Sequence, residues 1–324
     1  MLRNYVHNLN HLALAGEAAT TAPCWIDVIS PTPSEAVAIR NEFGIEIPTR
    51  DEMEDIELSA RLYQEDGATF MTATMLTALD AEDPVKSPVT FILRGRTLVT
   101  VRYGDSSPFD AFTHRANRPN GATWSSGEMV MLGLLEAIID RLADVLERLG
   151  LEIDAISREV FRSKVAKASK KTRDLQALIE QIGGKGDFVT AVRESLVSIS
   201  RLVAYHAALA ADEGKPGKEA RQRVKLLQRD AASLGEHATF LSGKITFLLD
   251  ATLGLINLEQ NQIIKIFTVA SVAFLPPTLV ASIYGMNFEM MPELSLSFGY
   301  PLSIGIMILS ALMPYLYFKR RGWL

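Results

Sequence analysis

Cysteine is almost missing from this 324-residue sequence, and charge is almost missing from its C-terminal end. Cys24 is the only cysteine, which excludes a disulfide framework and a thiolate metal site. From Ile266 to Phe318 the only charged residues are Glu289 and Glu293, whereas charge is dense nearly everywhere before that stretch. We therefore expect a compact membrane part at the C-terminal end of an otherwise soluble chain.

A basic surface is also missing. The chain has a net charge of −5, and its C-terminal part contributes +1, from two glutamates against Lys319, Arg320 and Arg321, so residues 1–265 carry −6. An acidic body argues against a nucleic-acid partner and suits a protein that meets cations. No Ser/His/Asp or Cys/His arrangement and no cofactor fingerprint stands out, so neither enzyme activity nor an organic cofactor is expected.

Two uncharged runs predict two transmembrane helices, Ile266–Tyr284 and Tyr300–Phe318. Each has 19 residues, which at ~1.5 Å per residue spans roughly the ~30 Å hydrocarbon layer of a bilayer. Lys265 precedes the first run and Lys319–Arg321 follow the second, while the connecting loop Gly285–Gly299 contains no Lys or Arg. The positive-inside rule therefore places both termini, including the tail 319–324, in the cytoplasm and the loop outside.

The cytoplasmic body is predicted to be α+β. Residues 1–120 alternate short β-rich runs with polar helical patches, which favours a small sheet with helices on its faces. The β-rich runs are Ala22–Ile29, Thr69–Leu79 and Val89–Arg102, and the helical patches are Pro33–Glu42 and Pro48–Ser59.

Residues 121–217 are predicted to be helical. Helical periodicity covers Glu128–Lys164, Thr172–Gln181 and Asp187–Ala211, with chain reversals expected at Gly183–Gly186 and Gly214–Gly217. Residues 218–284 contain no proline before Pro276 and are predicted to form one helix about 100 Å long. Residues 218–265 of this helix would form a stalk and residues 266–284 the first membrane span.

Polar residues of the first span fall on one line along the helix, at alternating intervals of four and three residues. This seam contains all the Ser and Thr residues of the span and comprises Asn257, Asn261, Ile264, Thr268, Ser271, Leu275, Thr278 and Ser282. Because hydroxyl and amide groups facing lipid would be poorly satisfied, the seam must face water or other helices. It would either line a pore between several chains or support close helix packing.

The end of the first span carries a recognisable motif. Tyr284-Gly285-Met286-Asn287 is followed by an acidic loop containing Met291-Pro292-Glu293-Leu294. This resembles the CorA magnesium transporters, whose signature is YGMN followed by an MPEL-type loop. The resemblance covers essentially the whole chain: α/β domain, stalk helices, two C-terminal spans and a basic tail.

The chemistry of this motif suits a hydrated cation. Mg2+ gives up its water reluctantly, so amide and carbonyl oxygens that hydrogen-bond its water shell are suitable ligands. Asn287 offers such an amide oxygen and Gly285 a backbone carbonyl, and the resemblance implies that the selectivity filter is Gly285, Met286 and Asn287. Glu289 and Glu293 would recruit cations by raising their local concentration, or would only keep an exposed loop soluble.

The resemblance implies a homopentamer in the cell (inner) membrane that admits hydrated Mg2+, and also Co2+ and Ni2+, down the electrochemical gradient. It also implies that cytoplasmic Mg2+ gates the channel, through ligands that no motif identifies. The pore asparagine maps to Asn261 and the hydrophobic constriction to Ile264, Phe267 and Leu275. The alternatives are a Zn2+ transporter of the same fold and a membrane-tethered scaffold or sensor without transport.

Overall fold

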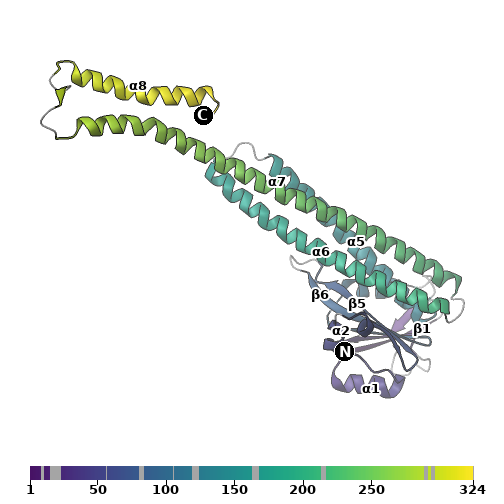
Figure 1. Ribbon diagram of the computed structural model, residues 1–324. Helices are drawn as coiled ribbons and strands as arrows, with labels where there is room; N and C mark the ends of the chain where they lie inside the picture. The colour runs from purple at the N-terminus through teal and green to yellow at the C-terminus, as the bar shows by residue number, and fades with distance from the viewer. Residues whose placement is uncertain are drawn as a thin grey trace. The chain divides into compact units, whose positions relative to one another are not determined.

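The computed structural model of the protein describes residues 1–8, 11–14, 23–55, 57–79, 84–104, 106–118, 124–162, 168–212, 217–287, 291–292 and 296–323. The chain divides into two compact units. The first contains Met1–Glu159 and Glu180–Phe247, and the second contains Val160–Ile179 and Leu248–Leu324. Three long helices, labelled α5, α6 and α7 in Figure 1, contribute residues to both units.

The first unit contains a sheet whose described strands lie in the order β2-β1-β3-β7-β6-β5-β4. β3 and β7 pair in parallel, with Ile26 opposite Val99, and the other described pairs are antiparallel. The strands are β1 (Leu2–Asn8), β2 (His11–Leu14), β3 (Trp25–Ile29), β4 (Leu62–Glu65), β5 (Ala68–Thr77), β6 (Val85–Arg94) and β7 (Thr97–Arg102).

The sheet confirms the predicted β-rich runs and adds strands to them. The run Val89–Arg102 forms parts of two strands rather than one, because Gly95 takes a φ of 57° and closes a hairpin between β6 and β7. Gly67, with a φ of 74°, does the same between β4 and β5. β1, β2 and β4 were not predicted, because their seven, four and four residues carry little strand periodicity.

Short helices cover the sheet. On one face, Ile39 of α1 (Pro33–Phe43) and Met53 of α2 (Arg50–Glu54) join a buried cluster with Ile26, Val28 and Val99. On the other face, Trp25 and Phe91 pack against aromatic residues of α4 (Ser107–Ala116). The predicted helix Pro33–Glu42 is confirmed as α1, and the patch Pro48–Ser59 contains α2 and the start of α3 (Leu58–Arg61).

A buried ion pair joins the two parallel strands. The Asp27 carboxylate on β3 accepts hydrogen bonds from Arg102 Nε and Nη2 on β7, at 3.1 and 2.9 Å. Both side chains are at most 3% exposed, and the Thr100 hydroxyl also donates to Asp27, at 2.9 Å. Because a buried charge needs a partner of opposite sign, this pair favours one register between β3 and β7.

The long helices α5 (Gly127–Arg162) and α6 (Ala168–Asp212) correct the prediction for this region. Gly183–Gly186 was expected to reverse the chain, but it lies within α6, so the two predicted helices there are one. Buried neighbours such as Ile182 and Val189 continue the packed face on both sides of the glycines, and Lys185 pairs with Glu152 of α5 at 2.6 Å. This packing outweighs the cost of glycine in a helix, about 1 kcal/mol per residue.

The second unit contains the apolar end of α7 (Lys218–Tyr284) and α8 (Gly299–Arg320). α7 is unbroken over the predicted range, including Pro276 and Pro277. α8 runs back alongside the end of α7 (Figure 1), and Lys265 lies 5.9 Å from the ring of Trp323. Among the described residues, these two helices are long and apolar enough to span a bilayer, and only 6% of the most apolar window of each is buried. Neither helix is thus buried in the core of this chain, which agrees with the prediction of two membrane spans.

Candidate ion pathway along helix α7

The predicted seam on α7 is open along its whole length. Each of its eight residues, from Asn257 to Ser282, is exposed in the single chain. Even its apolar members are open, with Ile264 60% and Leu275 66% exposed. The chain therefore uses none of the seam for its own packing, although a heptad line of this kind is typical of helix association.

The shielded residues of the same segment lie on the other side of the helix. Val269 is only 4% exposed, and Ala273, Pro276 and Val280 are half-buried. At about 100° per residue these positions face largely away from the seam. Since α8 runs alongside this part of α7 (Figure 1), it is the neighbour that shields them. The hairpin of α7 and α8 thus occupies one face of α7 and leaves the seam free.

The hydroxyl groups on the seam present acceptor oxygens. Thr268 donates its hydroxyl proton to the Ile264 carbonyl at 2.8 Å, and Thr278 donates to the Phe274 carbonyl at 2.7 Å. A hydroxyl has one proton and two lone pairs, so a hydroxyl that donates within its own helix keeps its lone pairs for an outside partner. Such oxygens can accept hydrogen bonds from the water shell of a cation.

Large apolar side chains alternate with these polar positions. Ile264, Phe267 and Leu275, predicted to form a constriction, are 60%, 68% and 66% exposed. Ile264 and Leu275 lie on the seam itself, whereas Phe267 lies on its flank, one residue before Thr268. In a ring of several α7 helices these side chains would form narrow apolar belts between polar ones.

The motif that follows α7 is placed at the open end of the helix. The helix ends at Tyr284, the Gly285 amide donates to the Ala281 carbonyl at 2.9 Å, and Asn287 is exposed. A Cβ on Gly285 would lie 3.0 Å from the Ala281 oxygen, closer than side chains normally approach. Glycine therefore suits this position because of close approach rather than because of a positive φ.

The structure does not test the predicted cation-recruiting glutamates or identify the ligands of a regulatory ion. Glu289 and Glu293, predicted to recruit cations, are outside the described residues. No group of three His, Cys, Asp or Glu residues that could hold a metal ion occurs in the part of the chain that the structure describes.

Two features of this region were not predicted. Glu259 is 7% exposed, and neither of its carboxylate oxygens has a hydrogen-bond partner among the residues that the structure describes. It continues a buried stripe of α7 that includes Leu248 and Thr252 at the same heptad spacing, a signal visible in the sequence. The contact between Lys265 and Trp323 joins residues 58 positions apart, so local patterns could not reveal it.

Comparisons with known proteins agree on one family. The family model described as CorA-like Mg2+ transporter protein matches residues 21–320. The chain is 40% identical over 301 residues to the magnesium transport protein CorA of Escherichia coli strain K12, covering 93% of this chain and 92% of that one. It is 39% identical over 301 residues to the protein of the same name in Salmonella typhimurium, with the same coverage.

A solved structure agrees with the fold. The complete structure of the CorA magnesium transporter from Methanocaldococcus jannaschii superposes with a TM-score of 0.78 at 18% identity. The match covers 100% of this chain and 99% of that one. At this identity the likeness concerns the fold alone, and it extends from the N-terminal sheet to both apolar helices.

Proposed function

The chain belongs to the family of CorA-like Mg2+ transporter proteins, and we propose that it forms a channel through which Mg2+ enters the cytoplasm. The family consists of ion transporters rather than enzymes. The observation that carries the proposal is the exposed seam of α7, which leads to Gly285-Met286-Asn287 at the end of the helix. Co2+ and Ni2+ would also pass, because their water shells resemble that of Mg2+.

The pore would form between copies of the chain. Two spans cannot enclose a conduit, but several α7 helices around an axis can, with their seams facing inward and α8 outside. We propose a homopentamer, as the family resemblance implies. The exposed apolar residues on the remaining faces of α7 and α8, including Phe274 at 73% and Met313 at 67%, would face lipid.

The mouth would select a hydrated ion. A ring of Asn287 side chains offers amide oxygens, and the turn at Gly285 adds backbone carbonyl oxygens, to the water shell of Mg2+. Below it, polar belts at Thr278, Thr268 and Asn261 would pass the hydrated ion along the axis. Ser271 and Ser282 add hydroxyl groups to the same line.

The apolar belts would close the channel. Narrow rings of apolar side chains, at Ile264 and Phe267 and again at Leu275, would exclude water, and a hydrated divalent ion cannot cross a dry segment. We propose that cytoplasmic Mg2+, held between copies, favours the closed arrangement. α7 is continuous from Lys218 to Tyr284, so a change at its N-terminal end is carried along one helix to the seam.

The proposed membrane orientation of the chain and the membrane potential both favour Mg2+ influx. Lys265, Lys319, Arg320 and Arg321 flank the spans, so by the positive-inside rule both termini would lie in the cytoplasm. A doubly charged ion crossing a potential of about 100 mV gains roughly 4.6 kcal/mol. No Asp, Glu, Lys, Arg or His occurs within residues 266–284 or 300–318, so passive flow is simpler than proton coupling.

The alternatives explain less. A Zn2+ transporter of the same fold would be expected to depart from Gly-Met-Asn at the mouth, whereas this chain has Gly285-Met286-Asn287. A scaffold or sensor without transport would use the long helices but would leave the exposed polar seam without a role.

Mg2+ uptake into proteoliposomes tests the proposal. Vesicles loaded with a Mg2+-sensitive dye are prepared with the intact chain, with Asn287→Ala, and with Asn117→Ala as a matched control. Asn117 follows α4 in the first unit, far along the chain from the seam. We expect uptake by the intact chain and the control and its loss in Asn287→Ala. Absence of uptake by the intact chain at low luminal Mg2+ would favour the scaffold or sensor.

A further inference from the structure

Basic residues gather in the second unit, where one apolar run begins and the other ends. One cation directly precedes the run 266–284 of α7 and three directly follow the run 300–318 of α8; they are named here the basic collar and are Lys265, Lys319, Arg320 and Arg321. Because α8 runs back alongside α7 (Figure 1), the start of one run lies beside the end of the other. The contact of Lys265 with Trp323 shows that these two ends meet.

The basic collar has no ion-pair partner among the residues that the structure describes. Its four side chains are exposed, and each of the described ion pairs lies elsewhere in the chain. The nearest described acidic residue along α7 is the buried Glu259, six residues before Lys265 and thus about 9 Å away along the axis. α8 contains no acidic residue. An anion from outside the chain can therefore approach the collar without competition from these helices.

A defined turn at the end of α8 holds Trp323 against the collar. Gly322 takes a φ of 72°, and its amide donates to the Lys319 carbonyl at 3.2 Å. The Trp323 amide donates to the Phe318 carbonyl at 3.1 Å, and the two rings lie 4.9 Å apart. These bonds form the Schellman arrangement that ends many helices, with its usual contact between side chains. The turn thus fixes Trp323 where its ring lies 5.9 Å from the Lys265 ammonium group.

Exposed aromatic rings accompany the collar. Tyr317 and Trp323 are 55% and 37% exposed, and the Arg321 guanidinium group lies 5.6 Å from the centre of the Tyr317 ring. Tyr and Trp are enriched at the headgroup level of membranes, because their rings are apolar and carry one polar group. Cations and rings together therefore stand where the phosphate groups of a bilayer would lie.

We propose that the basic collar binds the headgroups of anionic phospholipids in preference to those of zwitterionic phospholipids. Consecutive residues of a helix are about 100° apart, so residues 319, 320 and 321 spread their charges over about 200° around α8. This spread suits a layer of headgroups that surrounds the helix better than one small anion. In the orientation proposed above, the collar meets the cytoplasmic leaflet, whose surface is negatively charged. The inference rests on the two membrane spans and not on ion conduction.

Quenching of tryptophan fluorescence by brominated phospholipids tests the proposal. The chain has three tryptophans, of which Trp25 and Trp124 are 1% and 2% exposed and belong to the first unit, so Trp323 is the reporter at the membrane. The full-length chain is reconstituted into phosphatidylcholine vesicles that contain increasing fractions of brominated phosphatidylglycerol or of brominated phosphatidylcholine. The bromines are placed near the headgroup end of the acyl chains. Comparison of the two series gives the relative binding constant of the two lipids at Trp323.

We expect phosphatidylglycerol to be preferred about 5- to 25-fold. Each basic residue near an anionic surface contributes roughly a fivefold factor, and one or two residues of the collar reach a single headgroup. In 1 M salt, where the screening length is about 3 Å, the preference should fall to about twofold. Equal quenching by the two lipids at low salt would overturn the proposal.

Lys265→Gln with Arg320→Gln should lower the preference at least fivefold, while Lys319 and Arg321 keep positive charge at the end of α8. Quenching by brominated phosphatidylcholine should stay unchanged in this variant, which shows that Trp323 still contacts the bilayer. A preference that survives the double substitution at full strength would overturn the assignment to the collar.

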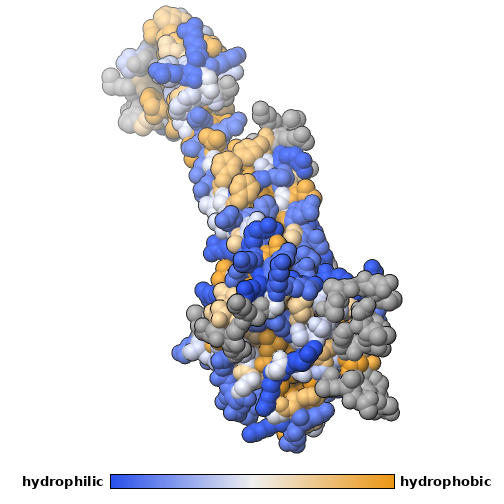
Figure 2. Space-filling view, turned by 90° about the vertical axis from the view of Figure 1, so that its right-hand side faces the viewer, coloured by the Kyte–Doolittle hydropathy of each residue, from blue (hydrophilic) through white to orange (hydrophobic). Residues whose placement is uncertain are grey.

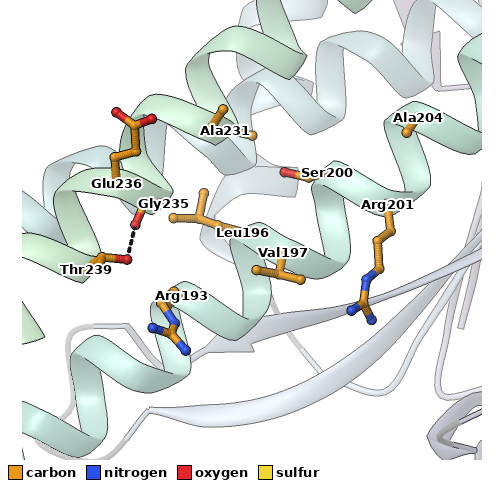
Figure 3. A pocket seen from close by; sticks show the side chains of 11 residues that line it. Arg193, Leu196, Val197, Ser200, Arg201, Ala204, Ala231, Gly235, Glu236 and Thr239 are labelled. Atoms are coloured by element: carbon orange, nitrogen blue, oxygen red, sulfur yellow. Dashed lines mark hydrogen bonds between the residues drawn. The ribbon is translucent and has the colours of Figure 1, made fainter.

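Arg193→Gln with Arg201→Gln is the matched control. Both arginines are exposed on α6 in the first unit, at the rim of a groove between α6 and α7 (Figure 3). Their replacement removes the same amount of charge without changing the collar, so the lipid preference should be kept. An equal loss in this control would mean that the net charge of the chain attracts the lipid, and would overturn the proposal.

The experiment is separate from the test of the channel, because it uses no Mg2+ gradient. A lipid preference in a chain that admits no Mg2+ would support the collar and count against the channel. Mg2+ uptake together with equal quenching by the two lipids would overturn the collar and leave the channel standing.

Discussion

The hydroxyl of Thr268 gives a sharp prediction about the pathway. In Thr268→Val a methyl group of similar size replaces the hydroxyl, so the shape of α7 is preserved. The hydroxyl donates to the Ile264 carbonyl at 2.8 Å, and Thr268 is exposed on the seam. The lone pairs of its oxygen are therefore available to the contents of the proposed pore. The substitution removes an acceptor for the water shell of the ion and leaves an apolar belt in its place.

The magnitude follows from the number of acceptors lost. One hydrogen bond contributes about 1 kcal/mol net, and a barrier higher by 1.4 kcal/mol slows passage about tenfold. If one or two threonines of the ring contact the water shell at once, uptake should fall by roughly 5- to 30-fold. Initial rates of Mg2+ uptake into proteoliposomes at equal reconstitution measure this fall.

Thr252→Val is the matched control. The Thr252 hydroxyl makes the same kind of bond, to the Leu248 carbonyl at 2.7 Å, but it is buried on the shielded side of α7. Its replacement should leave uptake within a factor of two, roughly, because the buried hydroxyl bonds only within its own helix and offers no lone pair to the seam. Equal losses in both variants, or no loss in Thr268→Val, would refute the assignment of acceptor oxygens to the seam.

Three further predictions concern the mouth, a buried carboxylate and the sheet. Gly285→Ala should slow Mg2+ uptake roughly tenfold although Asn287 is retained, because the new Cβ would lie 3.0 Å from the Ala281 oxygen and displace the turn. Unchanged uptake would show that this position does not need glycine for steric reasons. Glu259→Leu should raise the free energy of unfolding by about 1–3 kcal/mol, because it removes a buried carboxylate that has no partner among the described residues. Thermal unfolding in detergent would show this as a higher midpoint temperature. A lower midpoint would mean that the carboxylate has a partner in the assembly. Asp27→Ala should lower the free energy of unfolding by about 3–5 kcal/mol, because it leaves the Arg102 charge buried without its partner; a loss below about 1 kcal/mol in denaturant unfolding would contradict this.

Much of the architecture could be predicted from the sequence, because a strong helical repeat of apolar and polar residues identifies long helices directly. The range Lys218–Tyr284 was predicted residue for residue, since an apolar and a polar pattern continue across it without proline before Pro276. The membership of the CorA-like family, predicted from the motif at Tyr284–Asn287, is confirmed by the comparisons.

The errors have a common physical origin. Gly183–Gly186 was predicted to be a turn because four residues contain three glycines, yet it is helical. Local propensity argues for a break there, whereas contacts with residues distant in sequence, such as Glu152, decide the outcome. The short strands β1, β2 and β4 depend in the same way on their partners in the sheet rather than on their own sequences.

The candidate site could be predicted as a line on a helix but not as a surface. The sequence places Asn261 and Thr268 on one seam; only the structure reveals that α8 shields the opposite side and leaves the seam exposed. Figure 2 shows, for one face of the molecule, that apolar and polar residues are mixed over much of the surface. The number of copies and the ligands of the regulatory ion stay predictions, because both depend on contacts between chains.

Water access to the seam tests the channel most directly. Ser271→Cys places a thiol on the seam, and Ala270→Cys places one at the same depth on a different face of α7, with buried Cys24 as background. A charged, membrane-impermeant thiol reagent is applied to proteoliposomes during Mg2+ uptake. We expect it to modify Ser271→Cys and block uptake while Ala270→Cys stays unmodified and active. Modification of Ala270→Cys instead, or protection of both residues while Mg2+ still enters, would contradict a pore lined by this seam.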